Sequence, residues 1–376
     1  MNAPSKIDML AAARLTREGR LDDAMAVLRK SLAAPTAAPS EVSPKAHIPI
    51  NVHRIAGALG GLAQRIARLR PAIDELLTPA ARAPDRQPDG ARFESRSFSN
   101  AAGVRTYKLY VPGGYHGQPL PLVVMLHGCA QSPDDFALGT RMNELAEEQT
   151  FLVAYPAQCR SANAGKCWNW FNAAEQQRDR GEPSLIAGIT REVMQQFPVE
   201  TGRVYIAGLS AGGAAAAIMG SVYPDLYAAI GVHSGLPHGA ARDMPSAFTA
   251  MKNGGKKQGG MKKGGSAAAK TGVPAIVFHG DGDTTVHPAN GVDIIEQAKA
   301  GADHVVTVSS GTSAGGGRFT CTVHADPSGR PIAEHWALHG SGHAWSGGSA
   351  AGSYTDPRGP DASREMLRFF GQHRNS

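Results

Sequence analysis

No run in this sequence of 376 residues approaches the roughly 18 consecutive apolar residues that a membrane span needs. The apolar fraction of 42% and the charged fraction of 19% are typical of a soluble globular protein. We therefore expect no membrane partner. Residues 1–25 also lack the apolar core of about 7 to 15 residues that a secretory signal needs, because charged residues interrupt each apolar stretch. The cytoplasm is the location that this feature predicts.

Acidic and aromatic residues are absent from residues 251–271, which hold six lysines and many glycines. Outside this segment the chain is close to neutral, so the formal net charge of +6 is a local feature. Lysines without interleaved aromatic residues are typical of a solvated loop and not of a nucleic-acid-binding face. We expect a loop here and no nucleic-acid partner. The oligomeric state is left open by these features.

Cysteine is scarce: the chain has Cys129, Cys159, Cys167 and Cys321. Four cysteines would permit two disulfides, but free thiols are the expectation for a chain without an export signal. Histidine, cysteine and acidic residues show no zinc-like spacing, and no glycine-rich phosphate loop or dinucleotide fingerprint follows the first strand. We expect neither a metal nor another cofactor.

The chain divides near residue 90. Residues 1–90 are expected to form an N-terminal helical segment with Pro-rich linkers at 33–49 and 79–88, because their apolar residues fall mostly at helical spacing. Residues 91–376 are expected to form the catalytic domain. There, short β-rich apolar runs alternate with helical ones, which predicts a mostly parallel α/β sheet with helices on both faces. In such sheets ligands bind at the carboxyl ends of the strands.

The string G-x-S-x-G occurs twice, at 208–212 and at 311–315, and only the first copy has the context that nucleophilic catalysis requires. It follows a β-rich run and opens a helical one, whereas the second continues into glycines. A sharp reversal from strand to helix holds the Ser210 hydroxyl above the sheet. It also places the Ala211 backbone N–H at a helix N-terminus, facing a developing oxyanion. We predict Ser210 as the nucleophile and Ala211 as an oxyanion donor.

A serine nucleophile needs a histidine base oriented by a carboxylate, and in this type of fold they follow in the order Ser, Asp, His. Asp281 and Asp283 follow one β-rich run. We choose Asp283, which lies further into the loop, and expect Asp281 to cap the turn through its side chain. Of His339 and His343 at the end of the last run, we choose His343 because it lies beyond two glycines. His339 is expected to be a packed strand residue.

His233 and His287 also lie near strand ends, and we keep them as weaker alternatives for the base, with a polar loop position as the expectation for each. The loop after the run at 120–126 contains an HG turn, and the backbone N–H of Cys129 is the expected second oxyanion donor. A nucleophilic role for the Cys129 thiol would be redundant beside a complete serine set.

Six strings in the same order resemble the poly(3-hydroxybutyrate) depolymerase family of esterases over residues 106–370: LHGCAQ, CWNWF, GLSAGGA, HGDGDTTV, GHAWSGG and GSYTDPRGPDASREMLRFF. The chain is similar to the short-chain-length polyhydroxyalkanoate depolymerases and to their feruloyl and acetylxylan esterase relatives. The resemblance implies an α/β-hydrolase fold with the same triad of Ser210, Asp283 and His343, and the same oxyanion amides of Cys129 and Ala211. It also implies aromatic substrate contacts by Trp168, Trp170 and Trp345.

These features predict a serine carboxylic-ester hydrolase that cleaves poly- or oligo(3-hydroxybutyrate)-type esters through an acyl-enzyme. A feruloyl or acetylxylan esterase acting on plant-derived esters is one alternative. A non-catalytic protein that binds polymer or granules on a hydrolase scaffold is another. Secreted members of the family carry a signal peptide, so the resemblance makes an extracellular location the alternative to the cytoplasm.

Overall fold

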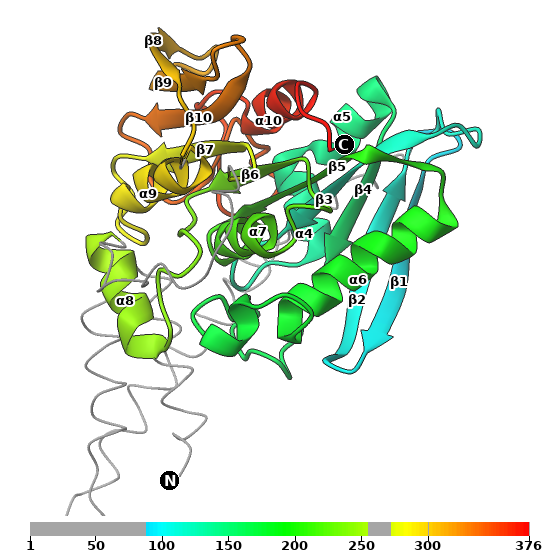
Figure 1. Ribbon diagram of the computed structural model, residues 1–376. Helices are drawn as coiled ribbons and strands as arrows, with labels where there is room; N and C mark the ends of the chain where they lie inside the picture. The colour runs from blue at the N-terminus through cyan, green and yellow to red at the C-terminus, as the bar shows by residue number, and fades with distance from the viewer. Residues whose placement is uncertain (1–87, 255–271, 300, 376) are drawn as a thin grey trace, which may run out of the picture. The chain divides into compact units, whose positions relative to one another are not determined.

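A computed structural model of the chain describes residues 88–254, 272–299 and 301–375 (Figure 1). The helices and linkers expected before residue 88 lie outside the described residues, as does most of the lysine-rich segment. Its first residues, 251–253, end helix α8 (Met244–Asn253), which corrects the loop expected there. This helix begins at Asp243, whose carboxylate accepts a hydrogen bond from the backbone N–H of Ser246.

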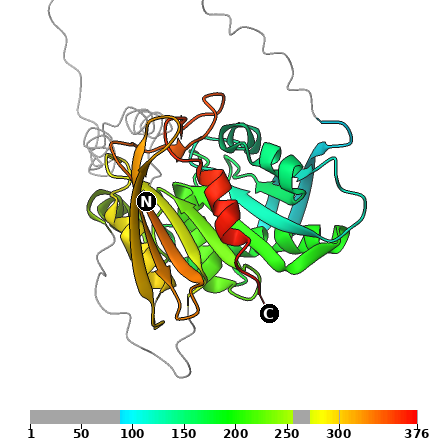
Figure 2. The same ribbon diagram turned by 90° about the horizontal axis from the view of Figure 1, so that it is seen from above.

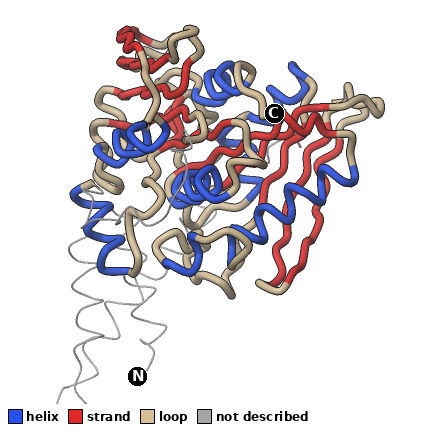
Figure 3. Tube along the Cα trace, in the orientation of Figure 1, coloured by secondary structure: helices blue, strands red, loops and turns tan. Residues whose placement is uncertain are grey.

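The strands form one large sheet in the order β1-β2-β4-β3-β5-β6-β7-β10-β9-β8 and a small sheet of β11 and β12 (Figure 3). The strands from β4 to β10 in that order are parallel, and both edges are antiparallel, which confirms the mostly parallel sheet. The bounds are β1 (Arg92–Asn100), β2 (Gly103–Val111), β3 (Leu120–Leu126), β4 (Leu152–Pro156), β5 (Val199–Leu209), β6 (Ala229–His233), β7 (Ala275–Gly280), β8 (Val305–Thr312), β9 (Arg318–Ala325), β10 (Pro331–Leu338), β11 (Trp345–Ser346) and β12 (Thr355–Asp356).

Helices cover both faces of the large sheet (Figures 1 and 2). On one face α6, α7 and α9 bury apolar residues in a cluster that contains Ile186, Met219 and Ile294. On the other face α4, α5 and α10 contribute to a second cluster. The remaining bounds are α4 (Pro133–Thr140), α5 (Met142–Gln149), the 3₁₀ helix η2 (Ala173–Gln176), α6 (Gly181–Gln196), α7 (Ala211–Val222), α9 (Ala289–Ala298) and α10 (Ala362–Phe370). None of the described helices is long and apolar enough to span a membrane.

The sheet order changes direction between β3 and β5. Strand β4 pairs with one side of β3 and β5 pairs with the other. The loops that leave the carboxyl ends of β3 and β5 therefore run in opposite directions across the sheet. Leu126 pairs with Gly208 at this end, which places the loop after β3 beside the turn after β5. Such a topological switch point is where open α/β sheets bind ligands.

Strands β1, β8 and β9 are not predicted by the sequence pattern, and for the two edge strands, β1 and β8, their exposure explains why. Every residue of β8 is exposed or half-buried, and β1 has no fully buried residue. Edge strands of this kind carry little of the apolar signal that marks a central strand such as β3 or β7. The second G-x-S-x-G string lies at the end of β8 and in its turn into β9, which confirms that it opens no helix.

Two histidines at the carboxyl ends of central strands are core residues. His233 ends β6, fully buried and stacked on Phe278 and Trp345, which corrects the polar loop position expected for it. Burial lowers its pKa to about 3. His127 follows β3, and burial lowers its pKa to about 4. Both imidazoles are therefore neutral in the folded protein at neutral pH.

We predict that replacing Gly212 by alanine destabilises the fold. A Cβ atom at Gly212 would lie 2.0 Å from the Leu126 carbonyl oxygen, so α7 and β3 would have to separate. Overpacking of this kind costs roughly 1–3 kcal/mol in the free energy of unfolding. Urea denaturation measures the change. Gly342→Ala is the matched control, since its Cβ would meet nothing within 4 Å; equal stability of the two variants would contradict the prediction.

We also predict that acid destabilises the protein between pH 6.5 and 4.5. Unfolded histidines take up protons below about pH 6.5, whereas folded His127 and His233 do not, so the free energy of unfolding falls as the pH falls. The slope is up to about 1.4 kcal/mol per pH unit for each histidine. Urea denaturation across this range should give a smaller slope for His233→Gln than for wild type or for His287→Gln, which alters an exposed histidine. Equal slopes in all three would refute the assignment.

Candidate active site

Ser210 lies in the sharp turn between β5 and α7 that the sequence predicts. Its backbone has φ 57° and ψ −119°, a conformation that non-glycine residues rarely adopt. The turn fits only because both flanking glycines lack a side chain: a Cβ at Gly208 would lie 2.4 Å from the carbonyl carbon of Gly212. Leu209 and Ala211 are buried, whereas Ser210 is half-buried. The arrangement therefore exposes the serine alone.

Backbone hydrogen bonds fix the Ser210 turn on both sides. The N–H of Ser210 donates to the carbonyl oxygen of His233 on the neighbouring strand at 2.9 Å, and the N–H of Ala214 donates to the Ser210 carbonyl at 2.9 Å. The first bond ties the turn to β6, and the second begins helix α7. These contacts hold a backbone conformation that would otherwise be unfavourable.

Asp283 and His343 form a hydrogen-bonded pair, as an acid and a base of a triad require. Nδ1 of His343 lies 2.7 Å from Oδ2 of Asp283, whose side chain is completely buried. Oδ1 accepts from the backbone N–H groups of Thr285 and Val286 at 2.8 and 2.9 Å. Burial raises the pKa of Asp283, but the hydrogen bond from His343 and the Val286 amide outweigh it, so the pKa lies below its ordinary value.

A carboxylate only accepts hydrogen bonds, so Nδ1 of His343 carries the proton and Nε2 carries the lone pair that a general base needs. Ser210 follows β5, Asp283 follows β7 and His343 follows β10, all at the same edge of the sheet. In the part of the chain that the structure describes, no hydrogen bond joins the Ser210 hydroxyl to His343. The structure thus brings Asp283 and His343 into contact and places Ser210 at their edge of the sheet.

The loop after β3 lies against Ser210. A Cβ at Gly128 would be 3.6 Å from Cβ of Ser210. On either side of Cys129 the amides are already paired: Gly128 donates to Oε1 of Gln131 at 2.9 Å, and Ala130 donates to the Gly165 carbonyl at 2.8 Å. Ala211 is the first residue of α7, so its N–H has no partner within the helix.

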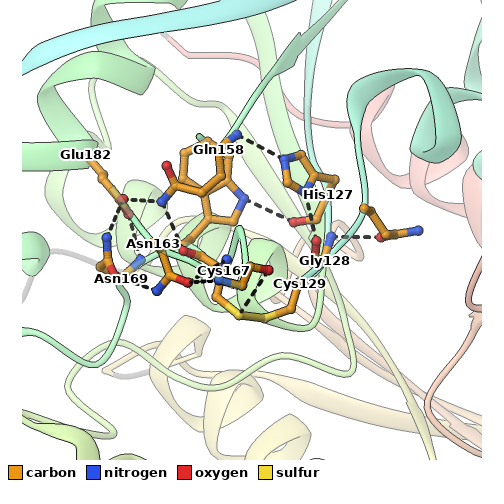
Figure 4. The surroundings of a disulfide bond; sticks show 11 residues. His127, Gly128, Cys129, Gln158, Asn163, Cys167, Asn169 and Glu182 are labelled. Carbon is orange, nitrogen blue, oxygen red and sulfur yellow. Dashed lines mark hydrogen bonds between the residues drawn. A yellow bond between two sulfur atoms is a disulfide. The ribbon is translucent and has the colours of Figure 1, made fainter. Parts of the chain in front are cut away.

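Cys129 and Cys167 form a disulfide, which corrects the expectation of free thiols (Figure 4). Cys159 and Cys321 are free, in agreement with that expectation. The bond joins the loop after β3 to the segment 167–171. The sequence offered no signal for this pairing, because 38 positions separate the two residues and only the fold brings them together.

The three tryptophans do not present an exposed face to a substrate. Trp168 and Trp345 are 1% exposed and Trp170 is 7% exposed. The indole N–H of Trp168 donates to the His127 carbonyl at 3.0 Å, and that of Trp345 donates to the Ser363 hydroxyl at 3.1 Å. They pack among core residues, so the substrate contacts that the resemblance implied stay a prediction.

A buried carboxylate that the sequence analysis missed holds the segment after Cys167 (Figure 4). Glu182 accepts from the backbone and side-chain N–H groups of Asn169, both at 2.7 Å, and from the side chain of Gln158. Gln158 also donates its backbone N–H to Nε2 of His127 at 3.1 Å. Burial raises the pKa of Glu182. A glutamate in the first turn of a helix is ordinarily solvent-exposed, so nothing in the sequence marked it.

Asp281 and His339, the candidates that were not chosen as acid and base, form a hydrogen-bonded pair with each other. Nδ1 of His339 lies 2.9 Å from Oδ2 of Asp281, and both side chains are partly exposed. The strand ends at Leu338, so His339 is a loop residue, which corrects the packed position expected for it. Asp281 caps the turn as predicted, since its Oδ1 accepts from the Gly340 N–H at 2.7 Å. His287 is exposed and accepts from the Ala289 N–H through Nδ1.

The sequence profile of the family described as Esterase PHB depolymerase matches residues 105–318, which are 214 of the 376 residues. The matched range contains Ser210, Asp283 and the oxyanion loop, and it ends before His343. Among the described residues, no group of three or more His, Cys, Asp or Glu side chains is arranged to hold a metal ion.

Three curated relatives illustrate the range of the family. A poly(3-hydroxyalkanoate) depolymerase C from Paucimonas lemoignei is 33% identical over 252 residues, which cover 65% of this chain and 59% of that protein. A poly(3-hydroxybutyrate) depolymerase from Ralstonia pickettii is 28% identical and covers 61% and 48%. Acetylxylan esterase A from Talaromyces purpureogenus is 28% identical and covers 53% of each chain. The chain thus spans about half the length of these relatives.

Among solved structures, an acetyl xylan esterase from Aspergillus awamori is similar to this chain with a TM-score of 0.56. The two are 19% identical, and the match covers 75% of this chain and 99% of that one. At this identity the likeness shows the fold alone, which is the predicted α/β-hydrolase fold. Since the family profile covers more than half of the sequence, the chain belongs to the Esterase PHB depolymerase family.

Proposed function

We propose that this protein is a serine carboxylic-ester hydrolase with Ser210 as nucleophile, His343 as base and Asp283 as the carboxylate that orients it. The observation that carries the proposal is the strained Ser210 turn at the same sheet edge as the buried Asp283–His343 pair. A buried aspartate held ionised beside a histidine favours the imidazolium that forms during acyl transfer. Membership in an esterase family supports the same chemistry.

In the proposed reaction, Nε2 of His343 takes the hydroxyl proton of Ser210 while the serine oxygen attacks the ester carbonyl. The N–H groups of Cys129 and Ala211 stabilise the negative oxygen of the tetrahedral intermediate. The C–O bond to the alcohol then breaks, and the alcohol leaves with the proton from His343. Water, deprotonated by His343, cleaves the acyl-enzyme in the same way and releases the acid. Each step moves one proton and needs no cofactor.

Poly- or oligo(3-hydroxybutyrate)-type esters are the substrates that we favour. The relative with 33% identity is named as a poly(3-hydroxyalkanoate) depolymerase, whereas the acetylxylan esterase relatives are between 27% and 30% identical. Acetylxylan or feruloyl esters are the second candidate, supported by those relatives. A non-catalytic polymer- or granule-binding protein is disfavoured because an intact acid–base pair and a strained serine turn have no use without chemistry.

The disulfide bears on the compartment in which the protein works. Disulfides persist in oxidising compartments and are rare where thiols are kept reduced. The Cys129–Cys167 bond therefore favours the extracellular alternative over the cytoplasm. No membrane or nucleic-acid partner is required by the proposed reaction.

We predict that Ser210→Ala abolishes hydrolysis of both amorphous poly(3-hydroxybutyrate) and a short p-nitrophenyl ester. Asp283→Asn should lower kcat by roughly 10³- to 10⁴-fold, because an amide no longer fixes the histidine tautomer. Asp326→Asn, which alters a partly exposed aspartate bonded within its own turn, should leave kcat unchanged. Clearing of polymer films and release of p-nitrophenol measure the two activities. Full activity of Ser210→Ala would contradict the mechanism, and cleavage of acetylxylan or methyl ferulate alone would move the substrate to plant-derived esters.

We predict that the disulfide supports both stability and turnover. A cross-link that closes a loop of 38 positions stabilises the fold by about 4 kcal/mol on the chain-entropy relation. The double variant Cys129→Ala/Cys167→Ala should lose a large part of this in urea denaturation and should show a lower kcat, because the oxyanion loop is released. Cys321→Ala, at a buried free thiol, is the control for loss of a sulfur atom. A kcat equal to wild type in the double variant would show that the disulfide does not position the oxyanion amide.

A further inference from the structure

We propose that Asp281 and His339 are positioning residues: their pairing holds the two catalytic loops at the separation that Asp283 and His343 need. The inference rests on the proposed ester hydrolysis. Asp281 lies two residues before the catalytic aspartate, and His339 lies four residues before the catalytic histidine. Neither residue needs to touch the reacting atoms for this role.

The first contact between the loops is made by Asp281 with both of its carboxylate oxygens. Oδ2 lies 2.9 Å from Nδ1 of His339, and Oδ1 accepts from the Gly340 N–H at 2.7 Å. The Asp281 backbone N–H donates to the Leu338 carbonyl at 3.0 Å. A carboxylate with two charge-assisted partners on one segment fixes distance and orientation together. The pair therefore sets where the loop after β10 leaves the sheet.

Two more contacts continue in register toward the site. The Gly282 N–H donates to the Ser341 carbonyl at 3.1 Å, and the next contact is the Asp283–His343 bond at 2.7 Å. The segments 281–283 and 339–343 are thus joined by three successive contacts, of which the catalytic bond is the last. Gly280 shows how close they lie, since a Cβ there would be 2.2 Å from the Ser341 carbonyl oxygen. A change in the distance between Asp281 and His339 therefore also changes the distance between Asp283 and His343, because only the Gly282–Ser341 contact lies between the two pairs.

His339 is in turn fixed to the neighbouring strand β9. Nε2 lies 2.9 Å from the Thr320 hydroxyl, and the His339 backbone N–H donates to the Arg318 carbonyl at 2.9 Å. With Nδ1 donating to Asp281, Nε2 accepts from Thr320, so the neutral ring satisfies both partners. Thr320 lies within a paired strand and not at a helix N-terminus, so this Asp–His–Thr chain lacks the oxyanion amides of a second catalytic centre. It anchors the loop to the sheet.

The pair is a poor candidate for a purely stabilising role. Both side chains are partly exposed, and at such positions even a fully charged pair contributes little to stability. Loop contacts near a site act instead on the distance between reacting groups, to which rates are sensitive. Loss of the pair should therefore appear in kcat more than in stability.

The test compares Asp281→Asn, His339→Gln and the double variant with wild type and with Asp326→Asn. The control breaks a partly exposed contact of the same kind, since Asp326 bonds Arg330 in the turn at the opposite end of β10. On a short p-nitrophenyl ester we expect kcat to fall roughly tenfold or more in each single variant. KM should stay within about twofold, and Tm should match the control. The double variant should be no worse than the worse single one, because the two residues act as a unit.

A spectroscopic readout separates positioning from a general structural effect. The low-field ¹H resonance of the His343 Nδ1 proton, assigned by its loss in Asp283→Asn, should shift or broaden in Asp281→Asn and His339→Gln and stay unchanged in Asp326→Asn. A kcat and resonance equal to the control would overturn the proposal, and so would a fall in kcat that is matched by a fall in Tm. If wild type hydrolyses no ester, the proposed function fails, and the resonance alone decides whether Asp281 and His339 position the pair.

Discussion

The close contact between the first turn of α7 and strand β3 is the constraint from which the nucleophile's geometry follows. Backbone meets backbone there, with no room for a Cβ atom at Gly212 beside the Leu126 carbonyl. Two residues before Gly212, at the start of this helix, Ser210 has a positive φ, a conformation that costs on the order of 1–3 kcal/mol. The same contact brings the loop after β3 against the serine. The proposed nucleophile and the proposed oxyanion loop therefore meet at one close contact between α7 and β3.

The acid–base half of the site is held in a different way. Asp283 and His343 lie on loops after β7 and β10, and hydrogen bonds between these loops, more than close packing against a helix, fix their separation. The buried charge of Asp283 is offset by two backbone N–H groups and one imidazole N–H. The Thr285 and Val286 donors lie within three residues of Asp283 in the sequence, and His343 lies opposite it on the neighbouring loop. The proposed nucleophile is thus positioned by core packing, and the proposed base by hydrogen bonds between the two loops.

The sequence signals that single out the proposed site residues are local, and so is the strand-to-helix turn that the structure places at Ser210. The strand-to-helix context singled out Ser210 over the second G-x-S-x-G string, and distance into the loop favoured Asp283 and His343 over their neighbours. The partners of the rejected candidates could not be predicted, since the Asp281–His339 pair depends on strand register. The Cys129–Cys167 bond and the burial of Trp168 likewise depend on contacts between segments far apart in the chain. Edge strands such as β8 escaped prediction because both of their faces are exposed.

The segment 167–171 has a structural role beside the proposed site, because it is tied to the loop after β3. Its first residue is covalently tied to Cys129, and the Trp168 indole N–H bonds to the His127 carbonyl, one residue before Gly128. From the other end, buried Glu182 fixes Asn169 through two hydrogen bonds. An unpaired buried carboxylate is costly, so its partners have to stay in place, and the segment with them. The disulfide and the Trp168 bond thus hold the loop after β3 from behind, on the side away from the Ser210 turn that we propose as the nucleophile's.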